Sequence, residues 1–194
     1  MKRLLTILLV LILAIAVAAL LYARSLVRRG FSAHDQPSAF ETFLARTMQS
    51  ASIPDAYRNA PNPWTGRATP DVMAEARRHF ADHCSTCHGN DGSGQSETGS
   101  GLYPKPPDMR LPATQNRTDG ELYYIIENGV RMTGMPAWGD PDGGLQDDDS
   151  WKLVLFIRHL PQLTPDELKD MQDYNPKGKF DDEYEHEGAG HHHH

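Results

Sequence analysis

Two cysteines and a histidine lie together in this sequence, and their spacing is suited to holding a metal cofactor. Cys84, Cys87 and His88 form the motif Cys-Ser-Thr-Cys-His, and the 194-residue chain holds 2 cysteines in all. Two thiols at this spacing can bond covalently to the two vinyl groups on one edge of a porphyrin, and the histidine that follows can ligate its iron. The motif therefore predicts one covalent haem c, attached at Cys84 and Cys87, with His88 as an axial iron ligand.

Three other kinds of site use the same residue types. A thioredoxin-like redox pair would need a strand before the first cysteine, whereas a helical pattern precedes it here. A zinc site could add His79 and His83 to the motif, but no second ligand pair at finger spacing follows. A disulfide between cysteines so close would be strained and would close almost no loop. Haem attachment is the interpretation that the motif favours.

The helix that must position the motif is predicted to begin at Thr69. Thr69 can cap it, Pro70 suits the first helical position, and Asp71 complements the positive end of the helix dipole. Side chains with a four-residue spacing then lead into the motif at Val72, Ala76, Phe80 and Cys84. We therefore expect an amphipathic helix that runs directly into the cysteine pair.

Further helices are predicted on both sides of this one. A capping box at Thr118 and Glu121 starts a helix that Gly129 ends, and acidic residues 147–149 precede a helix over 151–160. Short helices are expected over residues 38–50 and 164–174, and no segment alternates with a period of two. The fold class is therefore predicted to be all-α with long loops.

Residues 70–163 resemble a class I cytochrome c domain, and more closely the membrane-anchored bacterial monohaem cytochromes and the cytochrome subunits of terminal oxidases. The likeness rests on the motif followed by Gly89, the glycine-rich residues 90–94, the proline loop 103–108, and the segment Thr-Gly-Met-Pro-Ala-Trp-Gly at 133–139. It implies a cytochrome c fold of about four to five helices around the haem. It also implies that the last helix packs across the first, through Phe80, Trp151, Leu155 and Phe156.

The sixth iron ligand is predicted to be Met135. A thioether opposite His88 would stabilise ferrous iron and raise the reduction potential. Met132 and Met135 both follow the helix that ends near Gly129, but Met135 matches the Gly-Met-Pro-x-Trp pattern of the family. Met132 is the alternative.

The surroundings of the haem can be named only as candidates. The resemblance implies that a proline carbonyl accepts a hydrogen bond from the second ring nitrogen of His88, and Pro107 is the positional match, unless its loop is merely rigid. Candidate partners of the haem propionates, or contacts in the haem pocket, are Arg110, Arg117, Tyr103 and Trp138. Each could equally be a surface or packing residue.

The N-terminus carries an apolar segment long enough to cross a membrane. Between Leu4 and Ala23 only Thr6 is polar, and a helix of this length matches a hydrocarbon core of roughly 30 Å. A cleaved signal peptide is the alternative, because Ala16-Val17-Ala18 has the cleavage pattern, although it lies inside the apolar segment. We expect a retained anchor over residues 1–29, a proline-containing linker over 30–69, the haem domain over 70–163, and a short helix with an acidic tail over 164–194.

Charge and composition exclude some partners. The net charge of -7 argues against binding to nucleic acid. Residues 164–194 are expected to end in a disordered, histidine-rich tail, in which His186 and His191 to His194 could belong to a purification tag or capture a metal. The acidic side chains of the domain are expected to form a solvated face or a docking surface for a basic partner.

The resemblance implies a membrane-tethered electron carrier of a respiratory chain that is not itself an enzyme. Haem is attached to such motifs outside the bacterial cytoplasm, so the domain is expected in the periplasm, anchored to the inner membrane. Its partners would be redox proteins such as an oxidase, reductase or dehydrogenase. An electron-entry subunit of a respiratory oxidoreductase complex is the alternative, and a haem-based redox sensor is a weaker one.

Overall fold

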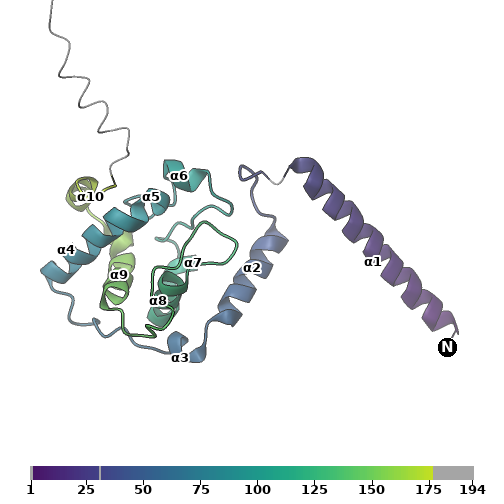
Figure 1. Ribbon diagram of the computed structural model, residues 1–194, viewed down its shortest axis with the longest axis horizontal. Coiled ribbons are helices and arrows are strands. Elements are labelled where there is room, and N and C mark those ends of the chain that lie inside the picture. The colour runs from purple at the N-terminus through teal and green to yellow at the C-terminus, as the bar shows by residue number, and fades with distance from the viewer. Residues whose placement is uncertain (1, 31, 177–194) are drawn as a thin grey trace, which may run out of the picture. The chain divides into compact units, whose positions relative to one another are not determined.

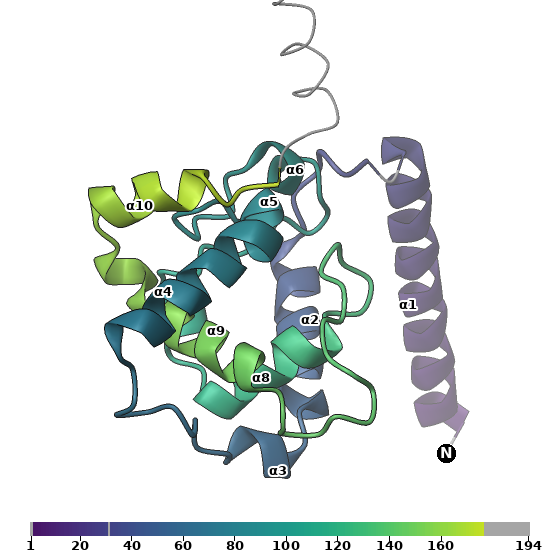
Figure 2. The ribbon, with the colours of Figure 1, turned by 60° about the vertical axis from the view of Figure 1, so that its left-hand side comes forward.

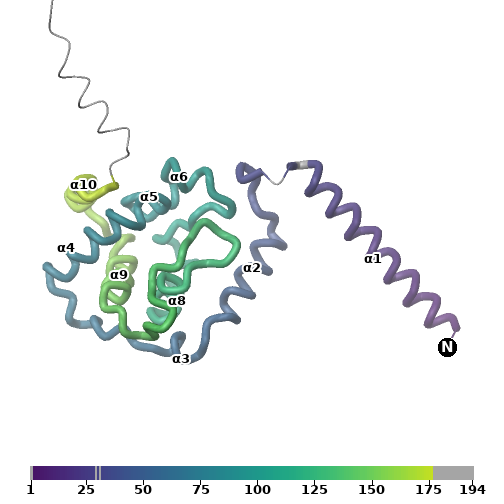
Figure 3. The backbone as a smooth tube through the Cα atoms, in the orientation of Figure 1, coloured from purple at the N-terminus to yellow at the C-terminus, as the bar shows by residue number. Residues whose placement is uncertain are grey.

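The computed structural model describes residues 2–30 and 32–176, and every regular element in these residues is a helix. Contacts divide the chain into two units, one up to Gln36 and one from Pro37 onward, and each is described by itself. The histidines of the predicted tail lie outside the described residues. Figures 1 and 3 follow the helices in chain order: α1 (Lys2–Arg29), α2 (Ala39–Ser52), α3 (Asp55–Arg58), α4 (Pro70–His79), a π-helical turn η1 (Phe80–Cys84), α5 (Ser85–His88), α6 (Glu97–Ser100), α7 (Pro112–Gln115), α8 (Asp119–Asn128), α9 (Asp148–His159), a 3-10 turn η2 (Leu160–Gln162) and α10 (Pro165–Gln172).

Helix α1 is the apolar helix that the sequence predicts at the N-terminus. An 18-residue window of this helix has a mean hydropathy of 3.3, which together with the length of the helix is sufficient for a membrane span. Its large apolar side chains are exposed along the whole helix, as they must be if lipid is to surround them. A retained anchor and a cleaved signal peptide, the two interpretations of this segment, would both form such a helix.

The predicted helix starts are confirmed. Thr69 Oγ1 accepts a hydrogen bond from the Val72 amide at 3.3 Å, with Pro70 as the first helical residue of α4. Thr118 caps α8 by accepting from the Glu121 amide at 3.1 Å. The same reciprocal capping box starts α2 at Ser38 and α10 at Thr164. Each cap satisfies backbone amides that have no partner inside the helix.

The core forms where α4 and η1 pack against α9, as Figure 2 shows. The rings of Phe80 and Phe156 lie 5.2 Å apart, and the ring of Trp151 stacks on Tyr123 of α8 at 4.1 Å. Phe80, Trp151 and Phe156 are buried, whereas Leu155 is only partly buried. The described residues therefore have the all-helical fold predicted for a cytochrome c domain, with its last long helix packed across the first.

The helix that leads into the cysteine motif is continuous, as predicted, but it changes geometry on the way. α4 ends at His79, and the next turn, Phe80–Cys84, is π-helical, with the Ser85 amide bonded to the Phe80 carbonyl five residues back. A π turn is wider than an α turn, so Cys84 is rotated from the position that a four-residue period predicts. Wide turns of this kind are frequent at functional sites.

Part of the interval expected to be a linker is packed inside the second unit. Ile53 is 2% exposed, and the Asn62 side chain, which is also buried, donates to the Trp151 carbonyl at 3.0 Å. The Tyr57 ring contacts Tyr124 of α8 edge-on at 5.0 Å. The packed unit therefore begins well before residue 70, because single residues between prolines make long-range contacts that no periodic pattern reveals. A spacer role for the remainder of residues 30–69 stays a prediction.

Gly120 provides a test of this packing. A Cβ atom at Gly120 would lie 1.7 Å from the Tyr57 carbonyl oxygen, a clash that only a shift of α3 could relieve. We expect Gly120→Ala to lower the free energy of unfolding by about 1–3 kcal/mol, measured by denaturant titration. Gly101→Ala is the control, because the nearest atom to its added Cβ lies at 3.4 Å. Equal stability of the two variants would show that α3 does not pack on α8 in solution.

Candidate functional site

The cysteine motif spans the end of the π-helical turn and the short helix α5. Cys84 is the last residue of η1, while Cys87 and His88 lie in α5, so all three come from a single stretch of helical backbone. Both thiols are free and partly buried. Burial, followed by the proximity of Cys87, raises the pKa of the Cys84 thiol to about 12, so this thiol is protonated at neutral pH. The low-pKa thiolate of a thioredoxin-like pair is therefore not formed at Cys84.

His88 is buried with an unsatisfied ring nitrogen. Its exposed fraction is 8%, and within the described part of the chain its Nδ1 atom has no hydrogen-bond partner. Burial lowers the pKa of the imidazole to about 4, which keeps the ring neutral at physiological pH. A neutral imidazole is the form that ligates metals, and a buried polar atom without a partner is costly unless something binds nearby. This donor set fits a haem held by the two thiols and by His88.

The glycine-rich segment after the motif holds the motif in place. Gly89 has a φ of 72° and ends α5, after which the Gly94 amide donates to the His88 carbonyl at 2.8 Å. Ser96 Oγ donates to the Cys87 carbonyl at 3.0 Å. Gly99 packs so closely that a Cβ atom there would lie 2.2 Å from the same Cys87 carbonyl. The carbonyl groups at the end of α5 are thus tied to one loop, which fixes the backbone from which His88 projects.

The proline loop passes beside this contact. A Cβ atom at Gly94 would lie 2.4 Å from the Pro106 carbonyl oxygen and 3.3 Å from that of Pro107. The structure therefore places Pro107 close to the residue whose amide binds His88. The predicted hydrogen bond itself is not formed, because among the described residues nothing bonds to His88 Nδ1. A role for the Pro107 carbonyl stays a prediction.

Met135 lies in a loop that is fastened back onto α8. Gly129, with a φ of 63°, ends the helix, and the Val130 amide donates to the Met135 carbonyl at 3.1 Å. The Trp138 amide returns to the Ile126 carbonyl at 3.2 Å. Within this loop Met135 is partly buried, whereas Met132 has a φ of 61° and is 91% exposed. The two methionines that the sequence left as alternatives therefore have different surroundings.

The methionine loop lies beside the cysteine motif. The Trp138 ring is 5.5 Å from the ring of His83, the residue before Cys84. On another side of the loop, a Cβ atom at Gly134 would lie 2.8 Å from the Leu102 side chain, which follows the glycine-rich segment. Residues separated by about fifty positions in the sequence thus meet around the motif.

Two of the predicted propionate partners, Arg110 and Arg117, are hydrogen-bonded to neighbouring side chains of the protein. Arg110 donates to both Asp108 and Asp91, with its Nη1 atom 3.0 Å from the Asp91 carboxylate. The hydrogen bond from Arg110 holds the pKa of Asp108 below its usual value. Arg117 donates to the Gln49 side chain at 2.7 Å.

The other two candidates differ in exposure and contact. The Tyr103 hydroxyl donates to Glu41 of α2 at 3.3 Å. Trp138 is 47% exposed and contacts His83. The structure therefore brings Trp138 next to the motif, whereas Tyr103, Arg110 and Arg117 are engaged with neighbouring side chains. Their roles toward a haem stay predictions.

Glu127 is a buried carboxylate that the sequence analysis missed. It is 6% exposed, and within the described part of the chain its Oε1 atom has no hydrogen-bond partner. Gly139, four residues after Met135, packs so closely that a Cβ atom there would lie 2.0 Å from Glu127 Oε2. Burial raises the pKa of Glu127, and the nearby Asp147 and Asp140 carboxylates raise it further. A charged residue at the end of an amphipathic helix looks solvent-exposed in sequence, so only the return of the loop reveals its burial.

This carboxylate should make stability depend on pH. Because the folded-state pKa lies above the unfolded value, the contribution of Glu127 to stability is fully present below the unfolded pKa and is lost as pH rises through the folded pKa. We expect Glu127→Gln to be more stable than the parent at pH 7 and to lose that advantage towards pH 4, measured by denaturant titration at each pH. Glu97→Gln, at an exposed residue of α6, is the control and should change neither value.

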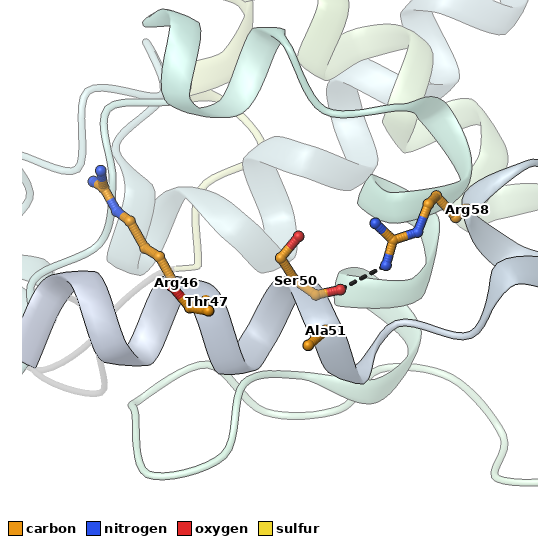
Figure 4. A pocket seen from close by; sticks show the side chains of 5 residues that line it. All are labelled: Arg46, Thr47, Ser50, Ala51 and Arg58. Atoms are coloured by element: carbon orange, nitrogen blue, oxygen red, sulfur yellow. Dashed lines mark hydrogen bonds between the residues drawn. The ribbon is translucent and has the colours of Figure 1, made fainter.

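A surface pocket lies elsewhere, between α2 and the α3 segment. It is lined by Arg46, Thr47, Ser50, Ala51 and Arg58, and Arg58 donates to the Ser50 carbonyl at 2.6 Å (Figure 4). None of the residues predicted to hold a haem lines it.

Comparison with known proteins agrees with this geometry. The family described as cytochrome C oxidase, cbb3-type, subunit III matches residues 71–157. A thiosulfate dehydrogenase of Stutzerimonas stutzeri (strain A1501) is 27% identical over 103 residues, which make up 47% of this chain and 31% of that protein. The cbb3-type cytochrome c oxidase subunit FixPc of Rhizobium leguminosarum bv. viciae is 28% identical over 116 residues, 59% of this chain and 35% of that protein.

A third relative is the cbb3-type cytochrome c oxidase subunit FixP of Rhizobium meliloti (strain 1021), 30% identical over 92 residues, 47% of this chain and 28% of that protein. The chain thus spans about a third of the length of each of these relatives. The residues matched by the family model include the cysteine motif and the methionine loop. Proteins with such domains bind haem c and exchange electrons with redox partners. Residues 71–157 of this chain are therefore a class I cytochrome c domain.

Proposed function

We propose that this protein is a membrane-tethered c-type cytochrome that transfers single electrons in the periplasm. One haem c would be bound covalently by Cys84 and Cys87, with His88 and Met135 as the axial ligands of its iron. The observation that carries this proposal is the buried, neutral His88, whose Nδ1 atom has no partner among the described residues, directly after two free thiols. The partial burial of Met135, against the full exposure of Met132, supports the choice of the second ligand.

When bound, haem c supplies a one-electron couple between ferric and ferrous iron. The residues around it would set its potential: His88 would ligate the iron as a neutral imidazole, and a thioether from Met135 would favour the ferrous state. The glycine loop fixes the backbone of His88 through its carbonyl group. The loop carrying Met135 is held to the end of α8 by backbone hydrogen bonds. Two firmly held ligands leave no position for a substrate, which supports a carrier rather than an enzyme.

A reduced-minus-oxidised absorption spectrum of membranes containing the protein tests this proposal. A c-type spectrum that stays with the protein after denaturation is expected. Because one relative is named a thiosulfate dehydrogenase, the same preparation should be assayed for thiosulfate oxidation, and we expect no turnover without an added enzyme. Turnover by the purified protein would contradict the assignment as a carrier alone.

A role as an electron-entry subunit of a respiratory complex is the second candidate. It is favoured by two relatives that are named as subunits of cbb3-type cytochrome c oxidase. Purification in mild detergent separates the two candidates. Stable co-purification with an oxidase or dehydrogenase supports the subunit, whereas a monomer that exchanges electrons with soluble donors supports the carrier. A redox sensor would require Met135 to leave the iron, which its backbone tethers oppose.

Deletion of the N-terminal helix tests the tether. We expect that replacing residues 1–29 by a cleavable export signal yields a red protein in the periplasmic fraction, because α1 is the only helix in the described residues that is long and apolar enough to span a membrane. Cell fractionation with haem staining measures this. Formation of haem in the exported protein would show that the domain can mature in the periplasm. Persistent association with the membrane would show that another segment or a partner binds there.

A further inference from the structure

Helix α2 directs its apolar side chains away from the unit on which it packs. Phe40, Phe43 and Met48 are 69%, 67% and 63% exposed, and no residue of the helix is buried. Side chains of the apolar helix α1 have similar values, such as 54% for Leu8 and 58% for Leu9. The apolar side chains of α2 are therefore as exposed as those of α1, the helix that is apolar enough to contact lipid.

The polar face of α2 makes the contacts with the rest of the unit. Glu41 accepts a hydrogen bond from Tyr103 at 3.3 Å, and Gln49 accepts one from Arg117 at 2.7 Å. At 100° per residue, the centre of the apolar face lies roughly 130° around the helix from these two residues. An ordinary surface helix has the opposite arrangement, with its apolar face on the core. The apolar face of α2, formed by Phe40, Phe43, Leu44 and Met48, is therefore open to a partner, while Thr47 and Ala51 beside it line the shallow pocket described above.

The length of the chain limits where that partner can be. α1 ends at Arg29 and α2 begins at Ala39, so residues 30–38 connect them. Nine extended residues reach about 30 Å at most, and a folded segment reaches less. The end of α1 is marked by the exposed Arg24 and Arg28, the residue type that lies at the headgroups where a helix leaves the hydrocarbon core. With α1 as the retained anchor proposed above, on which this inference rests, α2 begins within that reach of the bilayer surface.

The charges on α2 are compatible with that surface. Its charged residues are Glu41 and Arg46. Glu41 is engaged by Ser38 and Tyr103, on the side of the helix that faces the unit. Glu41 borders the apolar face next to Met48, but its carboxylate is held by these hydrogen bonds, and the exposed Arg46 can reach anionic headgroups on the other border.

We propose that α2 lies in the membrane interface with its apolar face in contact with lipid. Helices of this kind bury aromatic and aliphatic side chains to the depth of the boundary between headgroups and acyl chains. Contact through α2 would restrict how the cytochrome domain turns on its tether, and so which side of the domain faces membrane-bound partners. This inference does not depend on haem attachment.

Photo-crosslinking of the full chain tests the proposal. A benzophenone amino acid replaces Phe40 or Met48, and in a matched control it replaces Arg46, which lies between them in sequence but on a different side of the helix. All three residues are exposed, so none of the replacements removes a core contact. Each protein is reconstituted in vesicles of phosphatidylethanolamine and phosphatidylglycerol and irradiated, and adducts on the α2 peptide are identified by mass spectrometry.

Lipid adducts several-fold more abundant at positions 40 and 48 than at position 46 are the expected result. Equal yields at all three positions would mean that α2 merely collides with the bilayer, and would overturn the proposal. Adducts to protein, whether a second copy of this chain or a co-reconstituted oxidase, would overturn it in favour of a protein interface. Adducts to the haem would equally overturn it, since the apolar face would then line the cofactor site.

Discussion

Replacement of Cys84 and Cys87 by alanine in the same chain is expected to abolish covalent haem. Both thiols are free and lie on one helical stretch beside the buried His88, and the proposal assigns them the two thioether bonds. Haem staining after denaturing electrophoresis measures the loss, because only covalently attached haem survives denaturation. We expect no staining at the mass of the chain, where the parent protein stains strongly.

Thr86→Ala is the matched control for the cysteine variants. Thr86 lies between the two cysteines and is exposed, and its recorded hydrogen bond to Ser96 uses the backbone carbonyl rather than the side chain. Staining of this variant should equal that of the parent. Covalent haem in the double cysteine variant would disprove the attachment site.

Met135→Ala is expected to have the second largest effect. Loss of the thioether should remove the near-infrared absorption band that arises from sulfur-to-iron ligation. It should also lower the reduction potential, by a few tenths of a volt within the roughly 0.8 V range over which axial ligands set haem potentials. Potentiometric titration followed by absorbance measures both, and covalent haem should remain because the cysteines are unchanged.

Met132→Ala provides the control for this variant. Met132 is 91% exposed, so its removal should change neither the band nor the potential. If Met132→Ala lost the band and Met135→Ala kept it, the axial ligand would have to be reassigned to Met132, and the loop would have to rearrange when haem binds.

The helices of this protein could be predicted because their signals are local. A cap such as Thr118 with Glu121, or a four-residue apolar period, involves residues within one or two turns of each other. The cysteine motif is equally local, since its three chemical groups lie within five consecutive residues. The predicted helix over residues 38–50 is confirmed for the same reason.

The direction in which α2 faces could not be predicted. Its periodicity shows that it has an apolar side, and such a side normally covers a core. In the structure, hydrogen bonds of Glu41 and Gln49 turn the polar side of α2 towards the unit. Their partners, Tyr103 and Arg117, come from distant parts of the chain. A pattern within one helix contains no information about which distant side chain will pair with it.

The sequence by itself determined the longer helices and their starts, the cysteine motif and the apolar segment at the N-terminus, but not the short helices α3, α6 and α7. Only the tertiary structure decided that the chain from Ile53 to Asn62 belongs to the packed unit, that Glu127 is buried, and that Met135 is sheltered while Met132 is not. The physical reason is the range of the interactions. Caps and periodicity act over three or four residues, whereas burial depends on which segments come together when the whole unit folds.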